Sequence, residues 1–263
     1  MSPLLRKPAQ TNPIHSITPQ NAGWRYVGFE LDRLNDGETL SGDTGEREMC
    51  VVLVTGRAEI SVGGASFGVV GGRMDVFEGK PWSVYVPGGA RFAVTAHGAC
   101  EIALCSAPAV EPRPARLIPP DEVGEETRGK GGNMRHVRNI LPDTSPIASS
   151  LLVVEVITPG GNWSSYPPHK HDTDDYPNET YLEETYYHRF RRGNGFGFQR
   201  IYTDDGALDE TMAFGHGDVV LAPKGYHPVG APYGFDLYYL NVMAGPRRAW
   251  RFSFPKDHAF LTW

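Results

Sequence analysis

The chain has 263 residues and a net charge of −6, and it is rich in glycine (31) and proline (22). A chain of this length can bury one large core or two small ones. The acidic balance argues against a nucleic-acid-binding protein, which usually carries a basic stripe, and the lack of any run of 18 apolar residues argues against a membrane span.

The first ten residues and the cysteines bear on localisation. Residues 1–10 lack the apolar core of a signal peptide. The three cysteines, Cys50, Cys100 and Cys105, are odd in number and lie in apolar segments, as reduced core thiols do. We therefore expect a cytoplasmic protein.

Short apolar segments separated by Gly, Pro or Asp fill the first part of the chain and predict an N-terminal β-barrel over residues 1–110. The expected strands are 49–54, 58–62, 67–70, 83–86, 91–95 and 100–105. No window of 12 residues shows an apolar period of 3.6, so helix should be minor.

Residues 111–150 are rich in proline, glycine and charge, and we expect them to connect two domains. The middle of this connector, residues 128–137, is basic and glycine-rich. It could bind an anionic group or form a solvated loop, and the solvated loop is the interpretation that we favour.

Residues 151–263 repeat the pattern of the first part and predict a C-terminal β-barrel. The expected strands are 151–157, 184–190, 196–202, 210–214, 218–222 and 235–242. The chain is therefore predicted to be all-β, with two barrels of the jelly-roll type joined by a connector.

Four side chains of the second half have the types and the order of a metal site. His169 and His171 are two residues apart, so on an extended segment they point the same way. Glu184 opens a later strand, and His227 ends the segment Pro223-Lys-Gly-Tyr-His. A His-x-His pair can simply lie on the surface, but this order of ligands is that of cupin barrels. The set suits one divalent ion, with Zn or Mn preferred over Fe or Ni.

The two halves resemble each other weakly and predict a duplicated barrel. Segments 84–89 and 220–225 are similar and lie 136 positions apart, and the same offset relates Glu48 to Glu184. The first half has Arg91 at the position of the third histidine, and no His-x-His pair precedes Glu48. We therefore expect the N-terminal barrel to hold no metal.

The same offset selects Glu184 as the carboxylate ligand over Glu183, since adjacent residues of a strand face opposite ways. The other acidic candidates are Glu179, Asp172, Asp174 and Asp175. If Glu184 faces the barrel interior, Tyr186 and His188 do so too and become candidate catalytic residues for proton transfer. Each of the two could instead simply line the barrel.

A candidate substrate-binding face lies on the next strand, where Arg200 and Tyr202 are two residues apart. The fork of an arginine binds a carboxylate bidentately, so these residues could hold a substrate carboxylate. A surface ion pair is the alternative for Arg200.

Several segments carry a resemblance to a known family. They are Trp163–Asp172, Leu182–Tyr187, Gly225–Gly230, Tyr238–Pro246 and Asp257–Phe260, with Arg128–Arg135 in the connector. They resemble the bicupin uronate isomerases, and among these the 5-deoxy-glucuronate isomerases (IolB proteins) of myo-inositol catabolism. The resemblance implies a metal-dependent aldose–ketose isomerisation of 5-deoxy-glucuronate to 5-dehydro-2-deoxy-gluconate. It implies a small uronate as partner and no nucleotide or flavin, and a homo-oligomer is compatible with it.

Three other activities remain open. The related pectin-type uronate ketol-isomerase places its glutamate close behind the second histidine, whereas residues 172–183 intervene here. A cupin dioxygenase can use Fe(II) on the same four ligands, and a sugar-binding cupin would have no enzymatic activity. We favour the isomerase of 5-deoxy-glucuronate.

Overall fold

The computed structural model of the chain describes residues 2–261. Strands make up almost all of its regular structure, and helix is limited within these residues to three short segments. They are α1 (Pro19–Ala22), η1 (Gly131–Asn133) and η2 (Lys256–Leu261). The predicted all-β class is confirmed. No helix in the described part of the chain is long and apolar enough to cross a membrane.

The chain divides into two compact units, which are described separately. The N-terminal unit comprises Ala9–Gly124 and Asn139–Val153, and the C-terminal unit comprises Met1–Pro8, Glu125–Arg138 and Val154–Trp263. The predicted connector, residues 111–150, contains three strands and is shared between the two units. The domain boundaries at residues 110 and 150 stay predictions.

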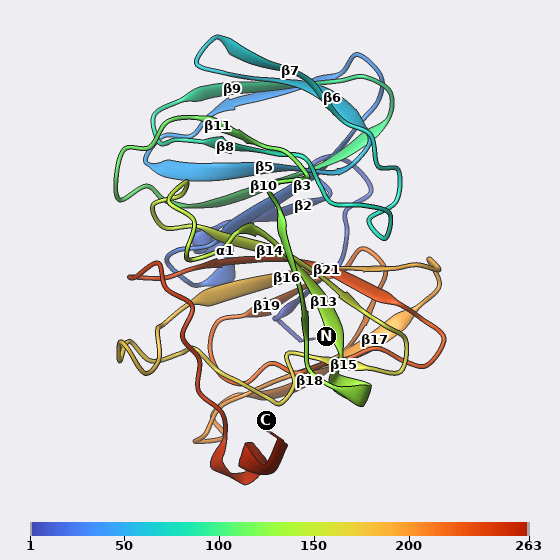
Figure 1. The fold of residues 1–263 in the computed structure, drawn as a ribbon, viewed down its shortest axis with the longest axis vertical. Helices are drawn as coiled ribbons and strands as arrows, with labels where there is room; N and C mark the ends of the chain where they lie inside the picture. Colours follow the sequence, from blue (N-terminus) through green and yellow to red (C-terminus); the bar gives the residue numbers. More distant parts are fainter. Residues whose placement is uncertain (1, 262–263) are drawn as a thin grey trace. The chain divides into compact units, whose positions relative to one another are not determined.

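Two antiparallel sheets build the N-terminal unit (Figure 1). The six-stranded sheet has the order β11 (Arg116–Ile118), β8 (Ser83–Val86), β5 (Arg47–Thr55), β10 (Cys100–Pro108), β3 (Gly28–Leu34) and β2 (His15–Ile17). The four-stranded sheet has the order β4 (Thr39–Asp43), β9 (Arg91–Ala96), β6 (Arg57–Val62) and β7 (Ala65–Gly71). Buried side chains from both sheets, among them Val51, Ile60, Val94 and Ile102, form one apolar core.

The C-terminal unit also contains two sheets (Figure 1). The larger has the order β1 (Leu5–Arg6), β19 (Val219–Ala222), β16 (Glu183–Phe190), β21 (Leu237–Ala244), β14 (Leu152–Thr158), β13 (Arg135–Leu141) and β12 (Gly124–Arg128). The smaller has the order β15 (Trp163–Ser164), β20 (Val229–Gly230), β17 (Phe196–Tyr202) and β18 (Asp209–Gly215). Strand β21 is buried along its whole length, and β16 pairs with it. The side chains of β16 therefore lie at the centre of this unit.

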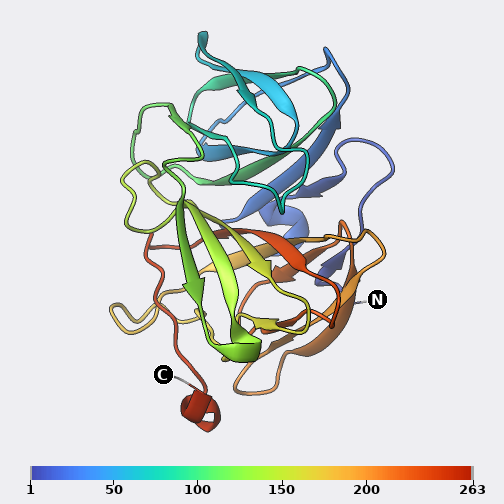
Figure 2. The same cartoon turned by 45° about the vertical axis from the view of Figure 1, so that its right-hand side comes forward.

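Strands β12 and β13 form a hairpin that bears on the site described next. Figure 2 shows the hairpin in green, with η1 at its tip. Arg128 is the last residue of β12 and Arg135 is the first residue of β13. The turn thus brings two arginines of the predicted connector to the same end of the hairpin.

Candidate metal centre

Three histidines of the C-terminal unit converge inside it. One ring nitrogen each of His169, His171 and His227 lies within 4.8 Å of the others, and all three side chains are buried. His169 and His171 flank Lys170, which forms a β-bridge with Ser253 through hydrogen bonds of 3.0 and 2.9 Å. The segment is extended there, so the alternation of side chains turns both imidazoles to one side, as the sequence predicted.

Glu184 completes the cluster from strand β16. Its Oε2 atom lies 3.1 Å from Nε2 of His171 and 3.4 Å from Nε2 of His227. Glu184 is buried, and its strand pairs with β19 and β21 on either side. The structure therefore brings together all four side chains that the sequence singled out as ligands.

The other acidic candidates have different partners. Glu179 accepts hydrogen bonds of 2.8 and 2.9 Å from the backbone N–H groups of Asp172 and Thr173, and it also bonds Ser253. Asp172 pairs with Lys170 at 2.9 Å. These carboxylates hold the loop before β16 in place and are not part of the histidine cluster.

Backbone carbonyls orient the three imidazoles. Nδ1 of His171 lies 3.0 Å from the carbonyl oxygen of Leu182, and Nδ1 of His227 lies 2.8 Å from that of Gly225. His169 is hydrogen-bonded to the backbone of Pro167. An imidazole that donates one N–H to a carbonyl presents the lone pair of its other nitrogen, which is how metal-bound histidines are usually held.

One buried atom in this cluster lacks a hydrogen-bond partner. Nε2 of His227 is buried, and no described residue forms a hydrogen bond with it. A buried polar atom without a partner is costly unless something else satisfies it. A donor set of three imidazoles and one carboxylate around such an atom fits a divalent transition metal.

The protonation of two of the three histidines also suits a metal. Burial lowers the pKa of His227 to about 4, and burial together with the charges of His227 and His171 lowers the pKa of His169 well below its usual value. For His171 burial acts in the same direction, but the hydrogen bond and the charge of Glu184 outweigh it and raise the pKa. His169 and His227 are therefore neutral at pH 7, the form that binds metal ions.

Tyr186 and His188 face the same side of β16 as Glu184. The ring of Tyr186 lies 5.9 Å from that of His227, and its hydroxyl is 3.2 Å from Oγ of Ser165. His188 lies one step further along the strand, stacks on Phe214 at 3.7 Å, and bonds Gln199 at 3.2 Å. Tyr186 is thus the nearer of the two to the cluster. The catalytic role of each stays a prediction.

Arg200 and Tyr202 are not brought to the cluster, and the substrate-binding role expected for them stays a prediction. In β17 the buried residues are Gly197, Gln199 and Ile201, so Arg200 and Tyr202 point outward. Arg200 forms two hydrogen bonds of 2.7 Å with Asp209 and is 47% exposed. It is the surface ion pair that was the alternative interpretation.

Side chains outside the set of predicted site residues line the cavities beside His169. One small cavity is lined by Arg128, Arg135, Ser165, Tyr239, Asn241 and Trp250, together with His169 and Glu184. An adjoining cavity of about 280 Å³ contains both arginines, Phe252 and Phe254. Tyr239 and Asn241 are two residues apart on β21, so their side chains lie on the same face of the strand. A sequence prediction that this face points into the barrel would have identified both as site residues.

The N-terminal unit offers no comparable cluster among the described residues. Met49 pairs with Val86 of β8 and Ser106 of β10, as Glu184 pairs with Ala222 of β19 and Met243 of β21. Met49 also lines a cavity of about 370 Å³ in this unit. A thioether therefore lies where the other barrel has its carboxylate ligand.

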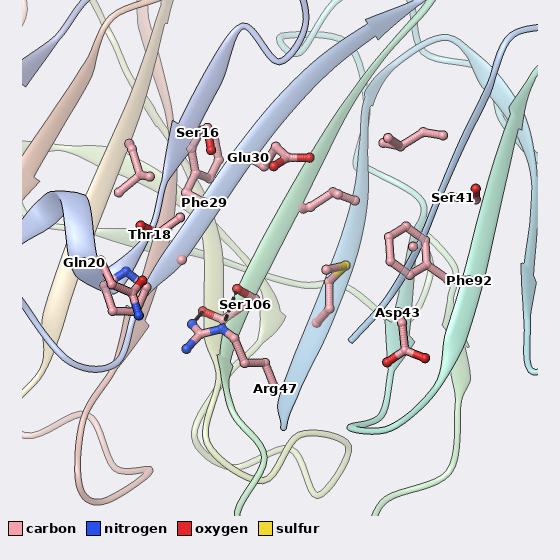
Figure 3. Close-up of a pocket in the computed structure, with 17 residues that line it drawn as sticks. Ser16, Thr18, Gln20, Phe29, Glu30, Ser41, Asp43, Arg47, Phe92 and Ser106 are labelled. Atoms are coloured by element: carbon pink, nitrogen blue, oxygen red, sulfur yellow. Dashed lines mark hydrogen bonds between the residues drawn. The ribbon is translucent and has the colours of Figure 1, made fainter. Parts of the chain in front are cut away.

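That cavity has a different chemistry from the metal centre (Figure 3). Its lining includes Arg47, which donates a hydrogen bond of 3.1 Å to Oγ of Ser106, and the carboxylates Glu30 and Asp43. No histidine is among its lining residues. The described residues there do not form a transition-metal site.

Glu48 faces away from this interior, contrary to the offset that related it to Glu184. Its carboxylate accepts hydrogen bonds from the hydroxyl of Tyr85 at 2.7 Å and from the N–H groups of Ser150 and Leu151 at 2.7 and 2.6 Å. The equivalence of Glu48 and Glu184 is therefore wrong by one residue, and Met49 is the counterpart. Glu184 nevertheless lies beside the histidine cluster, and its role as a ligand stays a prediction.

Comparison with known proteins identifies relatives over almost the whole chain. The sequence model of the KduI/IolB family matches residues 4–261. A 5-deoxy-glucuronate isomerase of Geobacillus kaustophilus is 55% identical over 255 residues, which are 97% of this chain and 92% of the relative. The 5-deoxy-glucuronate isomerase of Bacillus subtilis strain 168 is 47% identical over 268 residues, which are 99% of each protein.

Solved structures are similar as well. The crystal structure of an IolB-like protein from Salmonella typhimurium covers 98% of both chains with a TM-score of 0.96 and 52% sequence identity. An oxalate decarboxylase of Lactobacillus farciminis aligns with 100% of this chain and 91% of its own, with a TM-score of 0.68 and 12% identity. The second likeness bears on the fold alone, and with it the predicted bicupin fold is confirmed.

Proposed function

Because the chain belongs to the KduI/IolB family, we propose that it is a 5-deoxy-glucuronate isomerase, which converts 5-deoxy-glucuronate to 5-dehydro-2-deoxy-gluconate. The relatives with that name match almost all of the chain at about half identity. The observation in the structure that carries the proposal is the convergence of His169, His171, Glu184 and His227. An aldose–ketose isomerisation needs no redox cofactor, so no nucleotide or flavin is required.

The four converging side chains are the ones that would hold the metal. A divalent ion, with Zn or Mn preferred, supplies positive charge that stabilises negative charge developing on the substrate oxygens. Backbone carbonyls hold Nδ1 of His171 and of His227, which orients these imidazoles towards the cluster. Glu184 contributes the one negative charge of the set.

The residues that face the cavity define what the protein itself does in the reaction. An aldose becomes a ketose when a proton leaves C2 and one joins C1, while the C2 hydroxyl loses its proton and the C1 oxygen gains one. Burial and the charge of Glu184 raise the pKa of Tyr186 well above its usual value. Its hydroxyl is therefore protonated at neutral pH and can donate to a substrate oxygen.

Two further hydroxyl groups lie along the same wall. The hydroxyl of Tyr239 is 2.5 Å from Oγ of Ser164, and Ser165 bonds Tyr186. Hydrogen bonds of this kind fix the position of each tyrosine, so a sugar hydroxyl meets donors that are already oriented. His188 is the second candidate for proton transfer, through the ring nitrogen Nδ1 that no described residue bonds.

The proposed reaction is tested by turnover of the purified protein. We expect the protein to convert 5-deoxy-glucuronate to a 5-keto product without added NAD, flavin or O₂. The conversion is monitored by NMR. Chelation should abolish the reaction and a divalent metal should restore it, and His171→Ala should abolish it in a folded protein. Uptake of O₂ during turnover would point to a dioxygenase, and binding of the uronate without turnover would point to a sugar-binding protein.

We also propose a cytoplasmic location. Cys50, Cys100 and Cys105 are all free and buried, as expected for a protein that folds in a reducing compartment. Detection of the tagged protein in fractionated cells tests this, and recovery from the medium would contradict it.

A further inference from the structure

Arg135 presents a guanidinium group to the cavities beside the metal centre. Its Nη1 donates hydrogen bonds of 2.9 and 3.2 Å to the carbonyl oxygens of Tyr166 and Asn133. Arg135 lines both cavities, and His169 lines both of them too. Among the residues that the structure describes, no carboxylate forms an ion pair with Arg135.

A second arginine adds positive charge at the same place. Arg128 lines both cavities as well, and its guanidinium lies 4.8 Å from the centre of the Trp250 ring. It pairs with Glu126 at 2.7 Å, so its own charge is partly balanced. Burial and the charge of Arg128 both lower the pKa of Arg135, which nevertheless stays charged because arginine holds its proton in proteins.

A partly buried cation without a carboxylate partner is unfavourable unless an anion is bound beside it. The carbonyl bonds of Arg135 fix one end of its fork and hold it against the cavity. A fixed guanidinium is well suited to a carboxylate, which it binds through two parallel hydrogen bonds.

We propose that Arg135 binds the carboxylate of the uronate substrate and makes the enzyme selective for acids over neutral sugars, with Arg128 adding positive charge at the cavity. The inference rests on the proposed function. In an open-chain uronate the carboxylate and the aldehyde are at opposite ends. Contact of the carboxylate with Arg135 therefore leaves the aldehyde end free to reach the histidine cluster, and both ends of the sugar are held.

The selectivity is measured with two substrates of the same carbon chain. These are 5-deoxy-glucuronate and 5-deoxy-glucose, in which a CH₂OH group replaces the carboxylate. For Arg135→Gln we expect kcat/KM for the acid to fall by about 100-fold, mostly through KM, because binding contacts to a non-reacting group act on substrate and transition state alike. The value for 5-deoxy-glucose should stay within about threefold of wild type. Arg135→Lys should recover part of the loss, since it keeps the charge but not the fork.

A non-reacting ligand separates this inference from the proposed reaction. Calorimetric titration with the borohydride-reduced acid, which has the carboxylate but no aldehyde, should show about 100-fold weaker binding to Arg135→Gln than to wild type. If wild type binds this acid through Arg135 but does not isomerise 5-deoxy-glucuronate, the proposed reaction fails and the inference stands. If wild type isomerises the acid and Arg135→Gln does so equally well, the inference fails alone.

Two variants complete the experiment. Arg191→Gln removes an exposed arginine that pairs with Asp236, and it should behave as wild type towards both substrates. Metal content and circular dichroism of every variant are measured, because a misfolded or metal-free protein would lose both substrates together. An equal fall in kcat/KM for both substrates in a folded, metal-loaded Arg135→Gln would overturn the proposal. The proposal would also be overturned if Arg200→Gln lost the selectivity for the acid and Arg135→Gln kept it.

Discussion

The carboxylate of Glu184 lies 3.4 Å from Nε2 of His227, a buried ring nitrogen that no described residue bonds. The same oxygen lies 3.1 Å from His171. One negative charge thus faces two imidazoles whose Nδ1 atoms are hydrogen-bonded to backbone carbonyls. A cation between them would satisfy the unpaired nitrogen and the carboxylate together.

Replacing Glu184 tests this arrangement against its neighbour on the strand. Glu184→Gln should weaken metal binding by at least about tenfold, because an amide oxygen is a weaker ligand than a carboxylate. Glu183→Gln changes an equally buried side chain of β16 that faces the other way. Metal content per folded protein, measured by mass spectrometry after dialysis, should fall only in Glu184→Gln. Equal loss in both variants would mean that stability, not ligation, is affected.

Tyr186 is tested by removing its hydroxyl. Tyr186→Phe should lower kcat by about 10²-fold, in the range for loss of a general acid, while the metal content stays unchanged. Tyr187→Phe is the matched control, because Tyr187 is as buried but lies on the opposite face of β16. It should keep kcat within about threefold of wild type. Wild-type turnover in Tyr186→Phe would transfer the role to His188 or Tyr239.

His188 should make the protein sensitive to acid. Burial lowers its pKa to about 3, whereas an unfolded chain has histidines with a pKa of about 6.5. Below pH ~6.5 this histidine binds a proton in the unfolded chain but stays neutral in the folded protein until the pH approaches 3. The contribution of His188 to stability is therefore complete above pH ~6.5 and is lost as the pH falls towards 3. The loss is about 1.4 kcal/mol per pH unit.

The measurement is urea unfolding of metal-free wild type and His188→Asn between pH 6.5 and pH 5. The variant should lose roughly 2 kcal/mol less over this interval than wild type. Identical slopes would show that His188 is not held neutral in the folded protein. The same variant tests its predicted catalytic role, which requires a fall in kcat of about 10²–10⁴ with unchanged metal content.

Glu48 should stabilise the N-terminal unit. Its buried carboxylate accepts hydrogen bonds from Tyr85 and from Ser149, Ser150 and Leu151. In Glu48→Gln the side-chain NH₂ group would face N–H or O–H donors and could not accept their hydrogen bonds. We expect the free energy of unfolding to fall by about 3 kcal/mol. Glu59→Gln, on the exposed side of β6, should cost less than about 0.5 kcal/mol. An equal effect of the two changes would contradict the structural role of Glu48.

Period-two alternation explains why the convergence of the four candidate ligands could be predicted. His169 and His171 share one side of an extended segment, and Glu184 shares its face with Tyr186. The comparison of the two halves failed at β5 because the strands there are related by an offset of 135 positions, from Met49 to Glu184, instead of 136. A shift of one residue reverses the face of every side chain, and the sequence does not reveal it.

The phase of β17 could not be predicted for a different reason. Its aromatic residues Phe196 and Phe198 are each 47% exposed, while Gly197 faces inward. A side chain at Gly197 would meet the ring of Phe214 at 2.4 Å, so the inner face has no room for one. The pattern of hydrophobic residues in β17 therefore indicates the wrong inner face, the one that Arg200 shares with Phe196 and Phe198.

The role proposed for Arg135 depends on contacts between distant parts of the chain. Arg135 reaches Tyr166, and its cavity also contains Tyr239 and Trp250. Local composition described residues 128–137 correctly as basic and glycine-rich. It could not show that the hairpin of β12 and β13 places these charges beside His169, and the solvated loop that we favoured for the segment is wrong for Arg135.

The metal centre is tested most directly by X-ray diffraction from crystals of the metal-loaded protein, recorded above and below the absorption edge of the metal. We predict one anomalous peak per chain, enclosed by His169, His171, Glu184 and His227 at roughly 2.0–2.2 Å from each ligand atom. A peak away from these four side chains, or a second peak of equal height in the N-terminal barrel, would contradict the account.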